Sequence, residues 1–340
     1  MPVKNLIKNS MRSIIPKSVQ TKIYKTGQTR GADDDVIYQN RVARNSTVLI
    51  PFHEYDRCKI APSCNGTYEN GFIVLISPED YFDVETCCSL VEKGLRLGEN
   101  LLVFYETRHQ WNLYPPLAGW RPANSRIAPL EGEYVARVPA TTADGENKIL
   151  AGFNTSKMKG AGIRVYEYAD ASTIKACRLQ LEYLFWHCKD IKELIAESEM
   201  DETIAAQYIN LISRQAEKCG LADKNILMKE RIIDKEGYTI CPLCLRHISS
   251  KGFCLRVPQA EGRNVPDLTV TEVSLFHIHE LRTGEFNHVP YNLGWGHHHC
   301  NVVVKDSGIE QTLQWMRDVI RRNDRYDSAM NQNNDGISPL

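Results

Sequence analysis

The sequence of 340 residues has no apolar run long enough to cross a lipid bilayer, and no secretory signal is visible in it. Its net charge of −1 leaves no overall excess of positive charge, so any binding of nucleic acid has to be local. The eleven cysteines are odd in number and lack regular spacing, which argues against a disulfide framework and for a reducing compartment. These absences predict a cytoplasmic protein with no membrane partner.

Common nucleotide and hydrolase motifs are also missing. The chain contains no P-loop, no glycine fingerprint of a dinucleotide site and no nucleophile elbow. No internal repeat and no long linker divides it, although its length is enough for two domains with substantial cores. The function therefore has to be sought in a local group of residues.

One stretch, residues 241–306, concentrates nitrogen and sulfur donors. It holds seven of the ten histidines and four of the eleven cysteines. Cys241 and Cys244 form a C-x-x-C pair, and His297 and Cys300 form a second pair at the same spacing. Three thiolates and one imidazole fit a closed, structural zinc site and favour zinc over magnesium or calcium. The donors that could replace one of the four are His247, Cys254, His298 and His299.

The residues between the two pairs form a second pattern. Residues 275–281 are typical of a short strand, and its alternation puts His277 and His279 on one face. Asn292 lies further along, and Asn301 directly follows the last predicted zinc ligand, where a helix should begin. A zinc ion holding the two pairs would therefore direct a histidine and two asparagines toward one point.

This order of His, Asn and Asn, interleaved with two ligand pairs, resembles the HNH or ββα-metal nuclease superfamily, and in particular the recombination endonuclease VII family. The similar segments are L-F-H-I-H-E-L at 275–281, H-H-H-C-N at 297–301 and the helix expected after Thr312. The resemblance covers about the last third of the chain and is fairly specific, because spacing, residue type and order all agree. It implies a zinc-stabilised ββα-metal domain at the C-terminal end.

The resemblance also implies roles for individual residues. A histidine at the place of His277 activates a water molecule that attacks a phosphodiester, a task suited to an imidazole near neutral pH. An asparagine at the place of Asn301 helps to hold a divalent ion, usually magnesium, which stabilises the developing charge. Asn292 corresponds to the middle residue of the motif, which orients the base or its loop.

The chain departs from the family where the metal-binding aspartates are expected. Those two positions carry Phe276 and Ile278. Three outcomes stay open: another residue supplies the ligand, the duties of base and ligand are divided between His277 and His279, or the site has lost activity. The residues that could supply the ligand are His279, Glu280 and Asp306.

Upstream of this domain, we expect an α+β chain with a β-rich N-terminal region at 1–165 and a helical connector at 166–235. Its first thirty residues hold seven Lys or Arg and no acid, a composition that fits a basic arm neutralising DNA phosphates, a solvated terminus or an organelle transit peptide. A helix is expected at 81–95, and the aromatic segment at 107–122 is more typical of a packed loop than of a DNA contact. The expected strands span 46–50, 71–76, 101–105 and 134–138.

The connector should contain helices that begin at Asp170 and Asp201, the second ending at Gly220, and a third at 225–235. Phe185 to Cys188 is expected to be core. The zinc-bound nuclease domain should span 236–326 and be followed by a loose tail at 327–340, which is rich in Asn and Asp.

In size and layout the chain resembles type II restriction endonucleases with an HNH active site, the BstXI-like enzymes among them. That resemblance implies a site-specific cut in double-stranded DNA, with the N-terminal region contacting base edges in the major groove and a homodimer placing one active site on each strand. The alternatives are a structure-specific or nicking endonuclease, a non-catalytic zinc-stabilised DNA-binding protein and, least favoured, a zinc-stabilised interaction domain that does not bind DNA.

Overall fold

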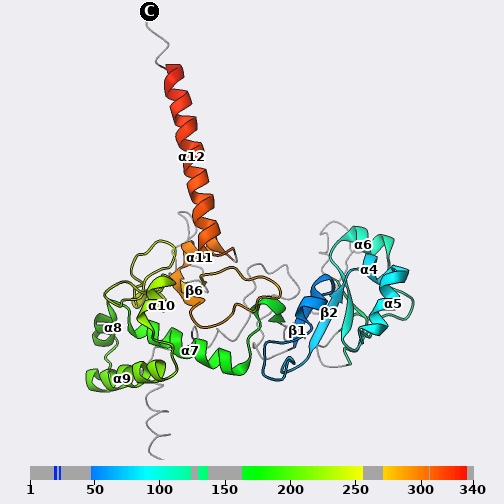
Figure 1. Cartoon of the computed structure of the whole chain (residues 1–340), viewed down its shortest axis with the longest axis horizontal. Helices are drawn as coiled ribbons and strands as arrows, with labels where there is room; N and C mark the ends of the chain where they lie inside the picture. Colours follow the sequence, from blue (N-terminus) through cyan, green and yellow to red (C-terminus); the bar gives the residue numbers. More distant parts are fainter. Residues whose placement is uncertain are drawn as a thin grey trace, which may run out of the picture. The chain divides into compact units, whose positions relative to one another are not determined.

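The structure is a computed structural model, and it separates into two compact units that are described one at a time. The first, here the sheet unit, consists of residues 20–179 and 282–290, and the second, here the hairpin unit, of residues 1–19, 180–281 and 291–340. Figure 1 labels the elements of both. The structure describes residues 19, 20, 23, 47–123, 129–136, 163–255, 271–305 and 307–334, with side chains up to residue 326.

The sheet unit is built on five parallel strands in the order β4-β3-β2-β1-β5. Alternate residues of each strand enter two different cores: Ile50, Val74 and Val103 face one, and Leu49, Ile73 and Leu102 face the other. A parallel sheet buried on both faces gives continuous apolar runs instead of alternating ones. The strands are β1 Val48–Pro51, β2 Phe72–Ile76, β3 Leu101–Tyr105, β4 Tyr134–Ala136 and β5 Ile163–Arg164.

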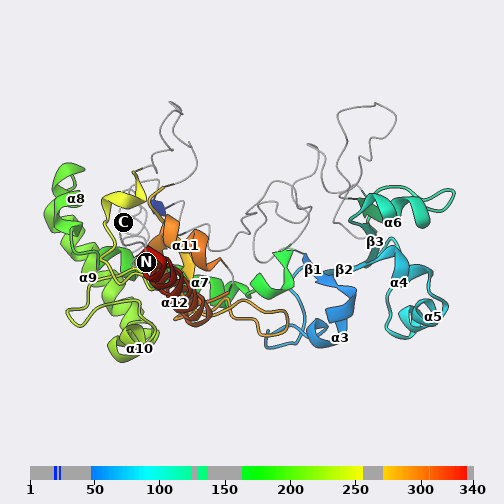
Figure 2. The same cartoon turned by 90° about the horizontal axis from the view of Figure 1, so that it is seen from above.

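Short helices connect these strands. α4 packs on both α5 and β3 (Figure 2), and the side chains of Ser77 and Asp83 cap the two helices by accepting backbone hydrogen bonds. Thr107 and Gln110 form a capping box at the start of α6. The connecting elements are η1 Phe52–Glu54, α3 Tyr55–Cys58, α4 Pro78–Phe82, α5 Val84–Glu92, α6 Arg108–Leu113 and η4 Val165–Glu167.

The four expected strands are confirmed, but their arrangement is not the β-rich region that the sequence predicted. This part of the chain alternates strand and helix around a parallel sheet, so it belongs to the α/β class. The helix expected at 81–95 is two helices that meet at Asp83. Connecting helices of four to nine residues are too short to show a clear helical period, which is why the pattern was missed.

The aromatic segment at 107–122 packs locally, as expected. The Trp111 ring lies edge-on to Tyr105 with 5.1 Å between ring centroids, and the Trp120 ring stacks on Phe82 at 5.9 Å. These contacts cover the sheet core beside β3. The basic N-terminal arm lies outside the described residues, apart from positions 19, 20 and 23.

One segment of the sheet unit comes from late in the chain. Residues 282–290 lie between strands β6 (Val273–His277) and β7 (Leu293–His297) of the hairpin unit, yet they cluster with the sheet unit. Phe286 packs against the sheet core, and the Arg57 guanidinium donates a hydrogen bond to the Thr283 carbonyl at 3.1 Å. Gly284, at φ +92°, lies against the same arginine.

The helices expected to begin at Asp170 and Asp201 are present, whereas the third, expected at 225–235, ends at Lys229. Asp170 accepts a hydrogen bond from the backbone of Thr173 at 2.7 Å, and Asp201 accepts one from Ile204 at 2.9 Å, as helix-capping residues do. Phe185, Trp186 and Cys188 are buried, as predicted. The helices are α7 Ala171–Trp186, which crosses from the sheet unit into the hairpin unit, α8 Ile191–Glu197, α9 Glu202–Lys218 and α10 Lys224–Lys229.

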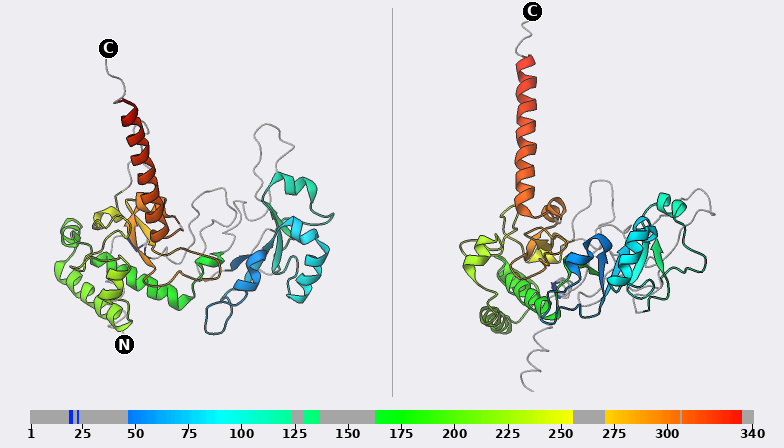
Figure 3. Two further views of the ribbon diagram at one scale, coloured as in Figure 1. Left: turned by 45° about the horizontal axis from the view of Figure 1, so that its top comes forward. Right: turned by 45° about the vertical axis from the view of Figure 1, so that its right-hand side comes forward.

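The rest of the hairpin unit is an antiparallel pair of strands and two helices. The predicted loose tail is wrong over its first half, because α12 continues to Asn334 and projects away from β6 and α11 (Figures 1 and 3). Over the described residues no helix is both long enough and apolar enough to span a membrane. The elements are η5 Lys251–Phe253, β6 Val273–His277, β7 Leu293–His297, α11 His298–Val304 and α12 Ile309–Asn334.

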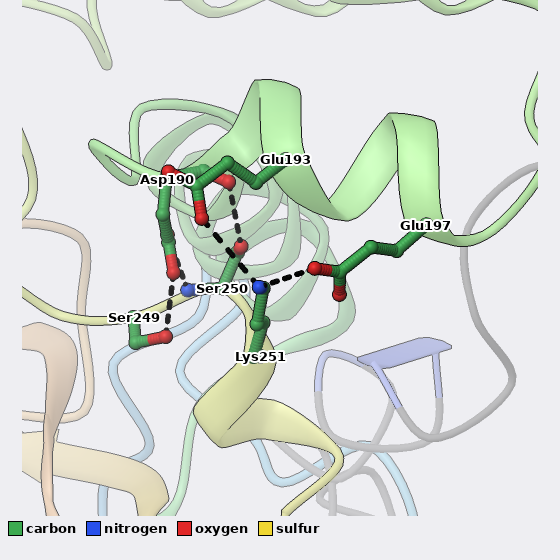
Figure 4. A network of polar contacts seen from close by, with 6 residues as sticks. All are labelled: Asp190, Glu193, Glu197, Ser249, Ser250 and Lys251. Atoms are coloured by element: carbon green, nitrogen blue, oxygen red, sulfur yellow. Dashed lines mark hydrogen bonds and ion pairs between the residues drawn. The ribbon is translucent and has the colours of Figure 1, made fainter.

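A polar network joins α8 to the start of η5 (Figure 4). The Asp190 carboxylate accepts hydrogen bonds from the Ser249 hydroxyl at 2.6 Å and from the Ser250 amide at 2.7 Å. Lys251 adds ion pairs to Glu197 at 2.6 Å and Glu193 at 3.5 Å. Burial alone would raise the pKa of Asp190, but the hydrogen bonds from the two serines outweigh it and hold that pKa below its usual value.

Replacing Asp190 with Ala should therefore destabilise the protein by about 1–3 kcal/mol at neutral pH, because two donors lose a charged acceptor. A depressed carboxyl pKa stabilises the fold above the unfolded-state pKa of about 3.9 and stops doing so as the pH falls through the folded-state value. The free energies of unfolding of the wild type and of Asp190→Ala, measured with urea, should therefore converge as the pH becomes strongly acidic. Glu193→Ala, which removes an exposed partner of Lys251, should change stability by less than about 0.5 kcal/mol. Equal effects of the two substitutions would contradict this account.

Candidate functional site

The four predicted zinc ligands lie together in the hairpin unit. The donor atoms of Cys241, Cys244, His297 and Cys300 are all within 4.8 Å of one another, and Cys244 Sγ lies 3.3 Å from His297 Nδ1. Zinc bonds of about 2.0–2.3 Å in a tetrahedron require ligand atoms that approach one another in this way. Within the described parts of the chain, no other group of three or more His, Cys, Asp or Glu side chains could hold an ion.

The first ligand pair sits on a tight knuckle of backbone. The Cys241 amide donates to the Arg246 carbonyl at 2.8 Å, and the Leu245 amide donates to the Cys241 carbonyl at 2.9 Å. Leu245 adopts a left-handed conformation, φ 60°, that lets the chain reverse. The Arg231 guanidinium braces the knuckle by donating to the Pro242 carbonyl at 2.7 Å. The backbone thus places both cysteines on one tight turn.

The second pair comes from the junction of β7 and α11. His297 is the last residue of β7 and the N-cap of α11, and Cys300 lies in the first turn of that helix. Burial, followed by the two neighbouring thiols of Cys241 and Cys244, raises the pKa of Cys300. A bound divalent cation would act in the opposite direction, because it favours the thiolate form.

The alternative donors do not join this group. His247 Nε2 lies 2.7 Å from an Asp234 carboxylate oxygen, so that imidazole is engaged elsewhere. The His299 ring is exposed and stacks on the His297 ring with 5.5 Å between centroids. Cys254 and His298 are likewise outside the four-donor group.

The predicted catalytic residues lie on the two strands and the helix that follow the knuckle. β6 and β7 are antiparallel, with His277 opposite Leu293, and α11 packs on both strands. His277 ends β6, Asn292 precedes β7, and Asn301 is the residue after Cys300 on α11. The chain therefore runs strand, strand, helix, with one predicted residue on or beside each element.

Asn292 fixes the chain beyond β6. Its side-chain oxygen accepts a hydrogen bond from the His279 amide at 2.6 Å, and its backbone oxygen accepts one from Ile278 at 3.1 Å. The Asn292 side chain is buried, with 4% of the residue exposed. Asn292 therefore sets the position of the backbone that carries His279.

Asn292 is itself held by its neighbour. Tyr291 has a positive φ of 65°, and its amide donates to the side-chain oxygen of Gln180 at 2.7 Å. The Tyr291 hydroxyl donates to the Gly220 carbonyl at 2.6 Å. Gln180 is fully buried and donates in turn to the Leu221 carbonyl at 2.9 Å. The left-handed turn before Asn292 is thus anchored to α7 and to the end of α9.

Phe276 and Ile278, which stand where the HNH resemblance would place aspartates, are part of the core. Phe276 is fully buried and Ile278 is 4% exposed. A side-chain carbon added at Gly296 would lie 2.3 Å from the Phe276 ring, so the ring fills space that the glycine leaves open. Of the possible replacements, Glu280 accepts a hydrogen bond from Gln311 at 2.8 Å, and Asp306 lies outside the described residues.

One acid near this site was missed by the sequence analysis. Glu230, directly after α10, places a carboxylate oxygen 2.6 Å from His279 Nε2. The two residues are 49 positions apart, and Glu230 belongs to no motif. Only the folding of α10 beside the loop after β6 brings them together, so no local pattern could have indicated the pair.

Replacing Cys241 or Cys300 with Ala should release zinc and lower the melting temperature by about 10 °C or more, since a structural zinc site supplies folding free energy. Metal content by mass spectrometry and melting by circular dichroism would measure both effects. Cys219→Ala is the matched control, because that exposed cysteine lies in the same unit and outside the four-donor group. A Cys241→Ala protein that kept one zinc per chain and its melting temperature would refute the ligand assignment.

Comparison with known proteins gives a family for the chain. A search of curated proteins finds no match. Among solved structures, one described as a crystal structure of a type II restriction endonuclease is similar over 46% of this chain, at 15% identity and a TM-score of 0.28. The similarity spans only 57% of that structure's chain, so this chain corresponds to little more than half of it. The family model described as BstXI restriction endonuclease matches residues 21–298, well over half of the sequence, and the chain therefore belongs to the BstXI restriction endonuclease family.

Proposed function

We propose that this protein is a site-specific endonuclease that cuts double-stranded DNA, as a type II restriction enzyme. The observation that carries the proposal is the match of the restriction endonuclease family over residues 21–298. That match takes in both units, so it covers the parallel sheet, the paired strands and three of the four metal-ligand residues, Cys241, Cys244 and His297, while Cys300 and Asn301 lie just beyond it. It also favours this function over a non-catalytic DNA-binding protein.

We further propose that cleavage occurs at an HNH-type site in the hairpin unit. The order of β6, β7 and α11, the positions of His277, Asn292 and Asn301, and the four-donor group support this assignment. In it, zinc on the four donors has a structural role, and a histidine of the strand end takes a proton from the attacking water. The two duties of base and phosphate or ion contact are then shared between His277 and His279.

A divalent ion such as magnesium would stabilise the charge that develops on the phosphate. The resemblance to HNH nucleases of the endonuclease VII type would place aspartates that hold such an ion at positions 276 and 278, and here those positions carry the buried residues Phe276 and Ile278. Asn301 is half-buried on α11 and remains a candidate ligand. We therefore expect cleavage to depend on magnesium, as the resemblance to HNH nucleases implies.

In this proposal, the sheet unit recognises the DNA sequence that is cut. A sheet unit with its own two cores can position side chains against base edges independently of the cutting site. A homodimer would place two hairpin units on the two strands of a palindromic site.

The first test is cleavage of a large, fully sequenced linear DNA with magnesium and, in parallel, with EDTA. We expect discrete bands that depend on the divalent ion, and sequencing the ends would give the recognition site. Uncut linear DNA together with cleavage of a four-way junction would instead indicate a structure-specific endonuclease. Intact DNA of both kinds, from folded and zinc-loaded protein, would overturn the proposal.

Replacing His277 with Ala should lower the cleavage rate by about 10²–10³-fold, the usual cost of losing a group that stabilises the charge developing on the phosphate. Zinc content and the affinity for duplex DNA should not change, since His277 is outside the four-donor group. Single-turnover cleavage and a filter-binding assay would separate the two effects. An unchanged rate would remove His277 from the site.

A further inference from the structure

His279 and Glu230 form a close side-chain contact that the roles given above to the other site residues do not explain. His279 Nε2 and Glu230 Oε2 are 2.6 Å apart, a distance typical of a strong hydrogen bond with a charged partner. The Glu230 side chain is 17% exposed, whereas the His279 side chain is 60% exposed. The carboxylate is thus largely enclosed, and the imidazole that it holds faces solvent.

His279 is fixed at two points. Its backbone amide donates to the buried Asn292 side chain at 2.6 Å, while its ring is held by Glu230. Asn292 depends in turn on the anchored turn at Tyr291. An imidazole whose backbone and ring are both restrained is oriented before any substrate arrives, which is what a catalytic group needs.

The hydrogen bond also selects a form of the ring. A carboxylate accepts only, so Nε2 of His279 has to carry the hydrogen that it donates. In the neutral imidazole, the other ring nitrogen then keeps its lone pair. Nδ1 of His279 is therefore the nitrogen able to accept a proton, and the exposure of the side chain lets a water molecule reach it.

We propose that His279 Nδ1 is the general base of the cleavage reaction and that Glu230 is the residue that positions it. The inference rests on the proposed endonuclease function. As the water oxygen forms a bond to phosphorus, its proton passes to His279 Nδ1, the bond from phosphorus to the leaving sugar oxygen breaks, and that oxygen takes a proton from solvent. His277, on the same strand end, is left to contact the phosphate or its ion.

The hairpin unit contains a natural control for this pair. His247 and Asp234 make the same kind of contact, with Nε2 and a carboxylate oxygen 2.7 Å apart, and side-chain exposures of 40% and 18%. That pair lies beside the knuckle, and no hydrogen bond described for it corresponds to the one that the His279 amide donates to Asn292. Asp234→Asn therefore removes a matching carboxylate without touching His279.

The test is a double-mutant cycle on the single-turnover rate, with DNA and magnesium saturating. His279→Ala should lower the rate by about 10²–10⁴-fold, and Glu230→Gln by about 10–100-fold, with duplex affinity and zinc content unchanged. In the His279→Ala background, Glu230→Gln should have no further effect, because a positioning residue acts only through the group it holds. Asp234→Asn should leave the rate as it is.

Three results would overturn the inference. The first is an unchanged rate in His279→Ala. The second is an equal penalty for Glu230→Gln with and without His279. The third is a loss in Glu230→Gln that higher magnesium restores fully, which would make the pair an ion site.

Nitrogen-15 NMR of labelled histidines shows which ring nitrogen of His279 carries the hydrogen, and it tests the contact with Glu230 without a cleavage assay. We expect the His279 signal to show hydrogen on Nε2 in the wild type and to lose that preference in Glu230→Gln. Wild-type protein that shows this tautomer but cuts no DNA would refute the proposed function and the base role while leaving the pairing intact. A His279 with hydrogen on Nδ1 would refute the pairing itself.

Discussion

The approach of four donor atoms from two distant segments is the constraint on which the hairpin unit depends. The knuckle at Cys241 and Cys244 and the junction at His297 and Cys300 are more than fifty residues apart in sequence, yet their donors lie within 4.8 Å. A two-stranded sheet is marginally stable by itself, and a helix of seven residues is short. An ion on these donors would tie β7 and α11 to the segment that follows α10, and with them the predicted catalytic residues.

Packing against α7 supplies the second support of this unit. Trp295, in the middle of β7, is fully buried, and its indole nitrogen donates to the Leu181 carbonyl at 2.8 Å. Gln180, one residue earlier on α7, holds the turn before Asn292. The same helix therefore fixes both the centre of β7 and the turn that precedes it. The position of Asn292 thus reflects tertiary packing as much as the motif to which it belongs.

Features encoded by neighbouring residues could be predicted from the sequence. Asp201 and Gly220 mark the ends of α9 because capping and left-handed termination need only local contacts. The metal-ligand group was predictable because each of its two pairs has the same short spacing, which can be recognised in the sequence. Its zinc and the roles of His277, Asn292 and Asn301 remain predictions. The direction of the strands was not predictable, since apolar runs such as 101–105 look alike in parallel and antiparallel sheets.

The pairing of Glu230 with His279 could not be predicted from the sequence either. Phe276, where the HNH resemblance would place an aspartate, is visible in the sequence, but the fold places Glu230 beside His279, and nothing near position 230 indicates it. Likewise, the need for glycine at position 296 becomes clear only when the Phe276 ring is seen to occupy that space.

Residues 282–290 give the chain an unusual connectivity. This loop leaves the hairpin unit after Leu281, packs Phe286 on the sheet core, and returns at Tyr291, immediately before Asn292. With the crossings near residues 19 and 179, the backbone passes between the units four times, so neither unit is a continuous piece of sequence. No single break in the backbone can separate them, and a fragment that begins within α7 carries a loop whose apolar side chain has lost the core that buries it. A truncation of this chain that removes the sheet unit would therefore uncover the Phe286 side chain.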